Sequence, residues 1–331
     1  MSDSDNLWAL VLAAGDGRRL QGLTTTRSGL AIPKQFCSLD RGPSLLREAI
    51  GRAARIVAPE RICAIVSAQH RLWWKPQLEG LEAGNVIVQP ANRGTAVGML
   101  LPLITVLERD PRARLIVLPS DHHVRDEARL SRALHRAAVP VESERAQIVL
   151  LGLEPGAADP QLGYIVPRRD GAQSHHAVER FVEKPDRVRA QELLEQGALW
   201  NMFIMAADAA SLLELFERRC PGVVKAMREV IRGIHHGERS AGEALTELYA
   251  ALPDLDFSRA ILQGQEASLR VLPVPDCGWS DLGTPERVAE ALDALPRARP
   301  DAVRAGRDVL LSLAAQSASM GRAQVAAAGG G

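Results

Sequence analysis

Short apolar runs alternate along the first half of the chain with stretches whose apolar positions recur at helical spacing. The runs end at glycine, proline or polar residues, which is typical of buried β-strands. Strands are predicted at Leu7–Ala13, Ile62–Ser67, Asn85–Gln89, Arg114–Pro119 and Gln147–Leu151. Helices are predicted near Ser44–Ile56, His70–Leu81, Arg93–Glu108 and Glu127–Ala138.

This alternation predicts right-handed βαβ units, and therefore an α/β fold with a mostly parallel sheet flanked by helices. In such sheets ligands bind beyond the carboxyl ends of the strands. The residues that directly follow each predicted strand are therefore the first candidates for a ligand-binding site.

After about residue 160 the strand-like segments follow one another more closely. Segments 162–167 and 175–185 are predicted to be strands joined by a turn at 168–173, and segments 199–207 and 267–275 are predicted to be later strands. Helices are predicted near Asp208–Arg219, Val223–His235 and Pro285–Leu295. We expect this half to add antiparallel strands to the same sheet and to form the second wall of a cleft.

The length of 331 residues suits one large α/β domain or two smaller units. The 40 basic and 40 acidic side chains balance, so the net charge favours binding neither to nucleic acid nor to a membrane. No apolar run reaches the ~20 residues that span a bilayer, and the acidic start "MSDSDN" is unlike a signal peptide. The four scattered cysteines are expected to be reduced thiols. We expect a cytoplasmic protein.

Lysine is scarce, because only four of the 40 basic residues are lysine and the others are arginine. Two of the four, Lys34 in "IPKQF" and Lys184 in "VEKPD", lie in sharply punctuated segments. A lysine ammonium is a compact point charge that the arginine fork does not reproduce. These two positions are therefore candidates for contact with an anion.

The segment "LVLAAGDGRRL" passes from the first predicted strand into a glycine turn. Gly15 and Gly17 allow a left-handed backbone and close approach to a ligand. The spacing is wrong for a P-loop, and Leu20 stands where a dinucleotide fingerprint has its third glycine. Two interpretations remain, a plain tight turn and a loop whose amides wrap a triphosphate with help from an arginine and a lysine.

The combination "LAAGDGRRL…PKQF" resembles the signature of sugar-phosphate nucleotidyltransferases, and its "PKQF" form is similar to that of bacterial mannose-1-phosphate guanylyltransferases. The resemblance implies that Arg19 and Lys34 are the catalytic cations. It also implies nucleotide contacts along the turn, from Ala13, Ala14, Gly15, Asp16 and Gly17. The loop between the two cations is longer here than is usual in the family, with Thr24–Ala31 as the extra part.

A second nucleotide element is "VIVQPANRGTAVG", which resembles the family segment P-x-x-R-N-T-A with Gly94 in place of the asparagine. The resemblance implies that Gln89, Gly94 and Thr95 meet the base and ribose. Without the resemblance, the segment is typical of an ordinary helix start with Asn92 or Thr95 near the cap.

Two aspartates are implied to hold Mg²⁺, the only cofactor we expect. Asp121 follows a predicted strand in "LIVLPSDHHV", and Asp281 lies in "CGWSDLGTPE", which resembles the family element W-S-D-V-G. Magnesium takes few protein carboxylates and keeps phosphate and water oxygens. The alternative is helix capping, by Asp121 for one helix and by Asp281 or Thr284 for the last one.

The sugar side of the family site has three counterparts. Gly163 matches the glycine of "G-Y-I", Asn201 matches a sugar-contacting asparagine, and Glu183 with Lys184 matches the "EKP" element. The resemblance implies that Glu183 holds sugar hydroxyls and that Lys184 holds the sugar phosphate. Phe203 stands where the family has glycine, and its bulk is expected to narrow the sugar pocket.

These elements occur in the family's order from Leu12 to Gly283, which implies a Rossmann-like nucleotidyltransferase sheet over residues 1–298. Its nucleotide half would span about 7–155 and its sugar-phosphate half about 156–298, followed by a partly disordered extension at 299–331. The implied substrates are a nucleoside triphosphate, GTP, and a sugar 1-phosphate, mannose 1-phosphate, and a homodimer is expected. The alternatives are a glucose-1-phosphate thymidylyl- or adenylyltransferase and a catalytically weak homologue that binds sugar nucleotides.

Overall fold

The computed structural model describes residues 6–26, 29–143, 148–168, 175–237 and 240–295. It contains a nine-stranded sheet in the order β3-β2-β1-β4-β9-β6-β10-β8-β7. The strands are β1 (Leu7–Ala13), β2 (Ile62–Ser67), β3 (Val86–Gln89), β4 (Arg114–Pro119), β6 (Ile148–Leu153), β7 (Tyr164–Arg168), β8 (His176–Val182), β9 (Leu199–Asp208) and β10 (Leu269–Val274). The short strands β5 (His123–Val124) and β11 (Trp279–Ser280) form a separate antiparallel pair.

Most strands run in the predicted direction, but β10, which belongs to the half expected to add antiparallel strands, runs parallel to β6. Strands β3, β2, β1 and β4 are parallel neighbours, with Ala9 opposite Ile62 on β2 and Leu10 opposite Val117 on β4. Strand β9 then runs antiparallel between β4 and β6, and β8 runs antiparallel to β10 and β7. The predicted fold class is confirmed, and strands from both halves of the chain belong to one sheet.

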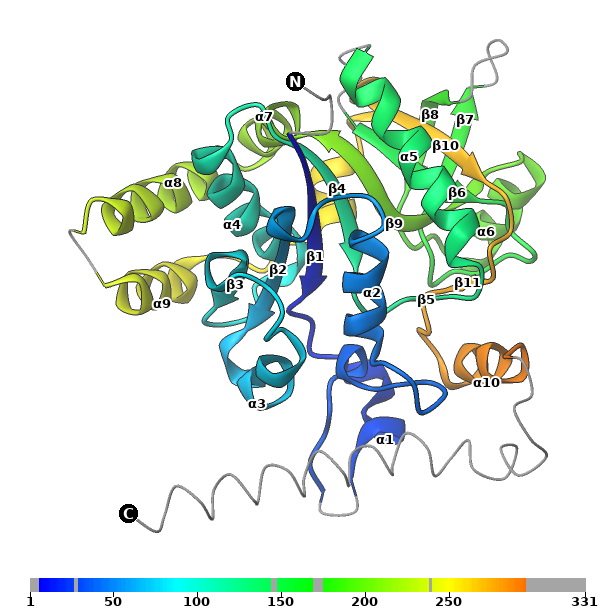
Figure 1. Ribbon diagram of the computed structural model, residues 1–331. Helices are drawn as coiled ribbons and strands as arrows, with labels where there is room; N and C mark the ends of the chain where they lie inside the picture. Colours follow the sequence, from blue (N-terminus) through cyan, green and yellow to red (C-terminus); the bar gives the residue numbers. More distant parts are fainter. Residues whose placement is uncertain (1–5, 27–28, 144–147, 169–174, 238–239, 296–331) are drawn as a thin grey trace.

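Helices cover both faces of the sheet (Figure 1). They are α1 (Gln21–Thr24), α2 (Leu45–Ala53), α3 (Arg71–Trp74), α4 (Gly94–Arg109), α5 (Glu127–Ser143), α6 (Arg187–Glu195), α7 (Ala209–Arg219), α8 (Pro221–His235), α9 (Ala241–Ala251) and α10 (Pro285–Asp293). Successive strand residues point to opposite faces, so Leu10 packs in one core with α4, α7 and α8, while Ala9 packs in another with α2 and α5.

One helix prediction needs correction, and some of the described helices were not predicted. The segment predicted as a helix over His70–Leu81 forms only the single turn of α3, because Pro76 cannot donate a backbone hydrogen bond and a 3₁₀ turn follows. Helices α6 and α9 were not predicted. The side chain of Asp186 caps α6 by accepting a hydrogen bond from the amide of Arg189, which is a readable sequence signal.

Several predictions fall on residues that the structure does not describe. These are the start of the strand at Gln147, most of the turn at 168–173 and the extension at 299–331. Among the described helices, none is both long enough and apolar enough to cross a bilayer.

The end of the sheet where β1 terminates carries a third, small core. Helix α10 lies near α1 at this end of the molecule (Figure 1). Val288 and Ala291 of α10 are buried together with Leu20 and Leu282. The last described helix is thereby packed against the segments that follow β1.

Candidate functional site

The Gln35 side chain stabilises the glycine turn after β1 through hydrogen bonds to its main chain. The side-chain amide donates hydrogen bonds to the carbonyl oxygens of Ala13 (3.2 Å) and Gly15 (2.7 Å). Gly17 has a φ of 64°, and a Cβ there would lie 2.9 Å from the amide nitrogen of Lys34. Only glycine therefore allows the turn and the "PKQF" segment to approach this closely.

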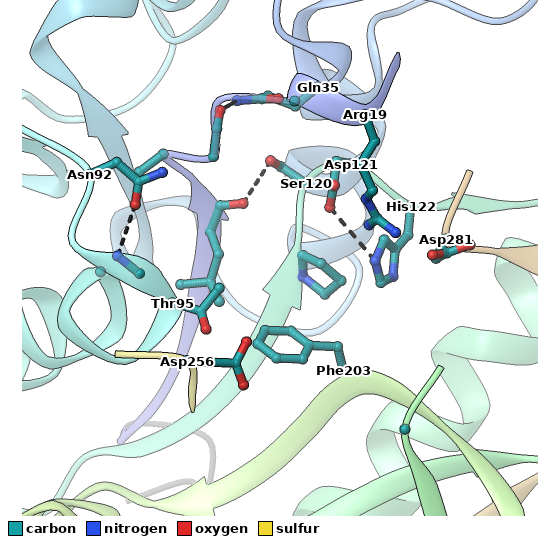
Figure 2. A pocket seen from close by; sticks show the side chains of 18 of the residues that line it. Arg19, Gln35, Asn92, Thr95, Ser120, Asp121, His122, Phe203, Asp256 and Asp281 are labelled. Atoms are coloured by element: carbon teal, nitrogen blue, oxygen red, sulfur yellow. Dashed lines mark hydrogen bonds and ion pairs between the residues drawn. The ribbon is translucent and has the colours of Figure 1, made fainter. Parts of the chain in front are cut away.

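A cavity of about 370 Å³ opens beyond the carboxyl ends of the parallel strands. Most of the predicted site residues line it: Ala14, Gly15, Gly17, Arg19, Gln89, Gly94, Thr95, Asp121, Gly163, Glu183, Lys184, Asn201 and Asp281. Figure 2 shows Arg19, Asp121 and Asp281 gathered on one side and Thr95 on the other. Both halves of the chain thus contribute to one cavity.

A second cavity of about 400 Å³ adjoins the first, and Gly17, Arg19 and Asp121 border both. Its lining includes Asp16 and Lys34, which do not line the first cavity. Ala13 lines neither cavity, because it is buried at the end of β1. All the other predicted site residues therefore lie on one connected surface.

Arg19 and Lys34, the two predicted catalytic cations, have different surroundings. Arg19 is exposed and has no hydrogen-bond or ion-pair partner among the residues that the structure describes. Lys34 is buried, and its Nζ lies 2.6 Å from the carbonyl oxygen of Asp281, 3.2 Å from that of Leu282 and 3.1 Å from Asp121 Oδ2. An ammonium has three hydrogens, so a phosphate that contacted Lys34 would have to replace one of these partners.

Asp121 follows β4 and forms a chain of contacts with His122 and Trp279. The indole of Trp279 donates a hydrogen bond to His122 Nδ1 (3.2 Å), and His122 Nε2 lies 3.6 Å from Asp121 Oδ1. Burial lowers the pKa of His122 to about 4, so the imidazole is neutral near pH 7. Burial alone would raise the pKa of Asp121, but the Lys34 ammonium, joined by His122 when that imidazole is protonated in acid, outweighs it and holds the pKa below its usual value. Asp121 is therefore an ionised carboxylate beside a neutral histidine.

Asp281 follows β11 and is engaged by Arg287 of α10. Its Oδ1 accepts hydrogen bonds from the Gly283 amide (3.0 Å) and from the Arg287 guanidinium. Burial would raise the pKa of Asp281, but His122 and Arg287 outweigh it and lower the pKa. Of the two caps considered for the last helix, Thr284 is the one that caps α10, and Asp126 rather than Asp121 accepts from the Arg129 amide in the first turn of α5.

The start of α4 lies against the segment that precedes a short π-helix at Ser258–Leu262. The Ala96 amide donates to the carbonyl oxygen of Leu255 (2.9 Å), and the Phe257 amide donates to Thr95 Oγ1 (2.8 Å). Gly94 has a φ of 78°, and a Cβ there would lie 2.3 Å from the Leu255 carbonyl oxygen. Gly94 therefore shapes this wall of the cavity through its backbone.

On the sugar side, the main chains of β9 and the 159–163 loop are joined. The Asn201 amide donates to the Gly163 carbonyl oxygen (2.8 Å). A Cβ on Gly163 would lie 2.7 Å from Glu183 Oε2, and Glu183 Oε1 lies 3.1 Å from Lys184 Nζ. Burial raises the pKa of Glu183, although Lys184 opposes the shift. The four residues predicted for the sugar side therefore lie together.

The backbone conformation of Phe203 suits the glycine that the family has at this position. Its φ is 56°, a left-handed conformation that glycine adopts freely and phenylalanine does not. The Asn201 side chain accepts a hydrogen bond from the Phe203 amide (3.1 Å), and Phe257 packs edge-on against the ring at 6.0 Å. An aromatic side chain therefore lines the cavity in a conformation that costs about 1–3 kcal/mol.

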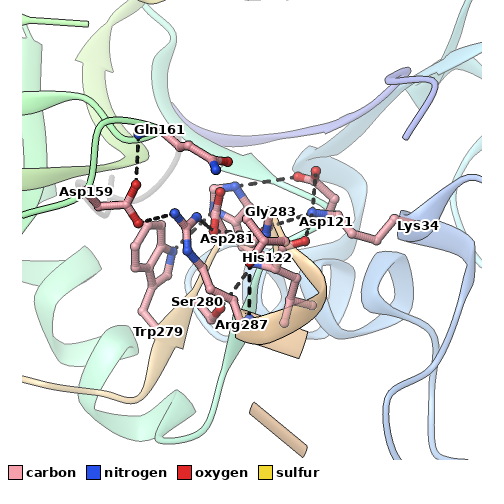
Figure 3. A network of polar contacts seen from close by, with 12 residues as sticks. Lys34, Asp121, His122, Asp159, Gln161, Trp279, Ser280, Asp281, Gly283 and Arg287 are labelled. Atoms are coloured by element: carbon pink, nitrogen blue, oxygen red, sulfur yellow. Dashed lines mark hydrogen bonds and ion pairs between the residues drawn. The ribbon is translucent and has the colours of Figure 1, made fainter. Parts of the chain in front are cut away.

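Sequence reasoning missed several residues of the site. Gln35 and His122 stand next to predicted residues, Lys34 and Asp121, so adjacency was an available signal. Arg287 and its second partner Asp159 carry no motif, and only the fold brings them to Asp281 (Figure 3).

The sheet order and the position of the cavity define the class, a Rossmann-like α/β protein whose site lies beyond the carboxyl ends of its strands. The chain belongs to the nucleotidyl transferase family, which it matches over residues 8–297.

The chain is also similar to individual proteins of known name. The chain is 30% identical over 280 residues to the xanthan biosynthesis protein XanB of Xanthomonas campestris, and 28% identical over 282 residues to the mannose-1-phosphate guanylyltransferase of Salmonella muenchen. Each match covers 83% of this chain and 57% of the relative, so the chain spans little more than half the length of these proteins. A crystal structure described as mannose-1-phosphate geranyltransferase from Thermus thermophilus superimposes with a TM-score of 0.74 at 29% identity, covering 89% of this chain and 81% of that one.

Proposed function

We propose that this protein transfers a guanylyl group from GTP to mannose 1-phosphate and releases pyrophosphate. The observation that carries the proposal is the cavity, which joins the glycine turn and Arg19 to Glu183, Lys184 and Asn201. The names of the Salmonella and Thermus relatives support mannose 1-phosphate as the sugar substrate. In the reaction, a phosphate oxygen of the sugar 1-phosphate attacks the α-phosphorus of GTP.

The attacking phosphate is ionised at neutral pH, so the reaction needs no general base. Its main obstacle is repulsion between two polyanions, which positioning and charge neutralisation reduce. Arg19 would neutralise the triphosphate, and its exposed side chain, which borders both cavities, supports this role. Lys184 would meet the sugar phosphate, and the neighbouring Glu183 would accept hydrogen bonds from sugar hydroxyls.

We propose Mg²⁺ as the cofactor. Asp121 and Asp281 would hold it, because their carboxylate oxygens are the ligands that a hard cation prefers. Both border the same cavity as Arg19. When bound, the metal would neutralise phosphate oxygens and orient them.

The test is a substrate matrix. Pyrophosphate release is measured with Mg²⁺ for GTP, ATP, dTTP and UTP, each paired with the 1-phosphates of mannose, glucose and N-acetylglucosamine. We expect the highest kcat/KM for GTP with mannose 1-phosphate. A tenfold higher kcat/KM for glucose 1-phosphate with dTTP or ATP would replace the proposal with a thymidylyl- or adenylyltransferase.

A second candidate function is a sugar-nucleotide-binding homologue with weak catalysis. Two observations favour it, the three oxygen partners of Lys34 and the Phe203 ring in the sugar-side wall. Tight binding of GDP-mannose in calorimetry, without pyrophosphate release from any pair in the matrix, would identify this function.

A further inference from the structure

Arg287 joins two carboxylates, one that lines the cavity and one in a loop whose later residues line it. One guanidinium nitrogen pairs with Asp281, which follows β11, and the other pairs with Asp159, in the loop before β7 (Figure 3). The Arg287 side chain is only 15% exposed, so water screens these contacts weakly. The planar fork of an arginine suits two acceptors at once, whereas a lysine ammonium offers a single point of charge.

Asp159 organises the sugar-side loop. Its Oδ1 accepts a hydrogen bond from the Gln161 amide (2.8 Å), and its own amide donates to the hydroxyl of the buried Tyr164 (2.7 Å). The next residues, Gln161, Leu162 and Gly163, line the cavity. A displacement of Asp159 would therefore move this wall.

At Asp281, the other carboxylate that Arg287 contacts, several charged groups lie close together. A Cβ on Gly283 would lie 2.4 Å from Asp281 Oδ2, 3.0 Å from Arg287 Nη1 and 3.1 Å from Arg19 Nη1. The carboxylate and both guanidinium groups thus converge on one glycine. The orientation of Asp281 beside Arg19 depends on the position of Arg287.

We propose that Arg287 is a positioning residue that sets the spacing between the triphosphate side and the sugar side of the cavity. It orients Asp281 directly and the 159–163 loop through Asp159. The inference rests on the proposed function for the identity of the two ligands. The pairing itself is independent of which base or sugar the protein prefers.

The test separates the two ends of the link. Asp159→Asn removes one charge-assisted contact and retains the side-chain shape, while Arg287→Lys retains the charge and loses the fork. Calorimetry gives the Kd for GTP with Mg²⁺ and, separately, the Kd for mannose 1-phosphate. Thermal unfolding reports the stability of each variant.

We expect Asp159→Asn to raise the Kd for mannose 1-phosphate about tenfold, the cost of one such contact, and to leave the Kd for GTP within about twofold. Arg287→Lys should raise both constants. The matched control is Glu217→Gln, which breaks the 2.6 Å Arg228–Glu217 pair between α7 and α8 and should change neither constant.

A lower melting temperature in Asp159→Asn with both constants unchanged would show a merely structural pair and would overturn the proposal. Equal changes of both constants in that variant would also overturn it, because the two ends would then not be separable. If the wild-type protein binds both ligands but releases no pyrophosphate, the proposed function fails while these binding measurements still test the link.

Discussion

The surroundings of Lys34 show how much a residue's role depends on its neighbours. From the sequence it is a rare cation in a phosphate-binding signature. In the fold its ammonium pairs with Asp121 and with the main chain at Asp281 and Leu282. Lys34 therefore also ties the segment after β11 to the end of β4, so its removal should affect both stability and turnover.

We predict that Lys34→Ala lowers turnover by about 10²-fold or more and destabilises the protein by about 1–3 kcal/mol. The destabilisation arises because Asp121 and two carbonyl groups lose their donor. Pyrophosphate release and urea unfolding measure the two effects. Lys225→Ala is the control, since that side chain is 78% exposed on α8 and should change neither quantity. Unchanged stability in Lys34→Ala would contradict the structural part of this role.

At the scale of elements, the first turn of α4 requires a glycine at position 94. Gly94 combines a left-handed backbone with close approach to the 254–257 segment, which itself lines the cavity. By contrast, Gly51 lies within α2, and a Cβ there would meet nothing within 4 Å. Substitution of glycine by alanine should therefore destabilise the protein at position 94 and stabilise it at position 51.

We predict that Gly94→Ala destabilises the protein by about 1–3 kcal/mol from backbone strain alone, with a further cost from the clash with Leu255. Gly51→Ala should stabilise it by about 0.5–1 kcal/mol, because alanine loses less backbone entropy in a helix. Urea unfolding checks both values, and calorimetry should show weaker GTP binding only in Gly94→Ala. A stable Gly94→Ala variant that binds GTP normally would refute the assignment of this turn.

For the whole molecule, the nine-stranded sheet supports residues of both halves of the cavity, and α10 packs against the segments that follow β1. Val288 and Ala291 cover Leu20 and Leu282, and Arg287 reaches Asp281 from the same helix. The catalytic region that we predict, residues 1–298, therefore has to include α10, the last described helix.

We predict that a chain ending at residue 298 keeps its kcat within about twofold, because its described cores and cavities are complete. A chain ending at residue 283 should lose activity and expose apolar surface, because α10 is removed. Pyrophosphate release and dye binding to exposed apolar surface distinguish the two chains. A large loss of activity in the longer chain would place part of the catalytic region beyond residue 298.

Local sequence patterns were enough to predict the sheet class, most strand positions and the family, because buried strands and glycine turns leave such patterns. It also indicated residues that come to line one cavity, from Gly15 to Asp281. It did not indicate the three partners of Lys34, the left-handed Phe203 or the link through Arg287. Those features depend on contacts between segments far apart in the chain, such as Asp159 and Arg287, and no local pattern encodes such a contact. Only the tertiary structure could decide them.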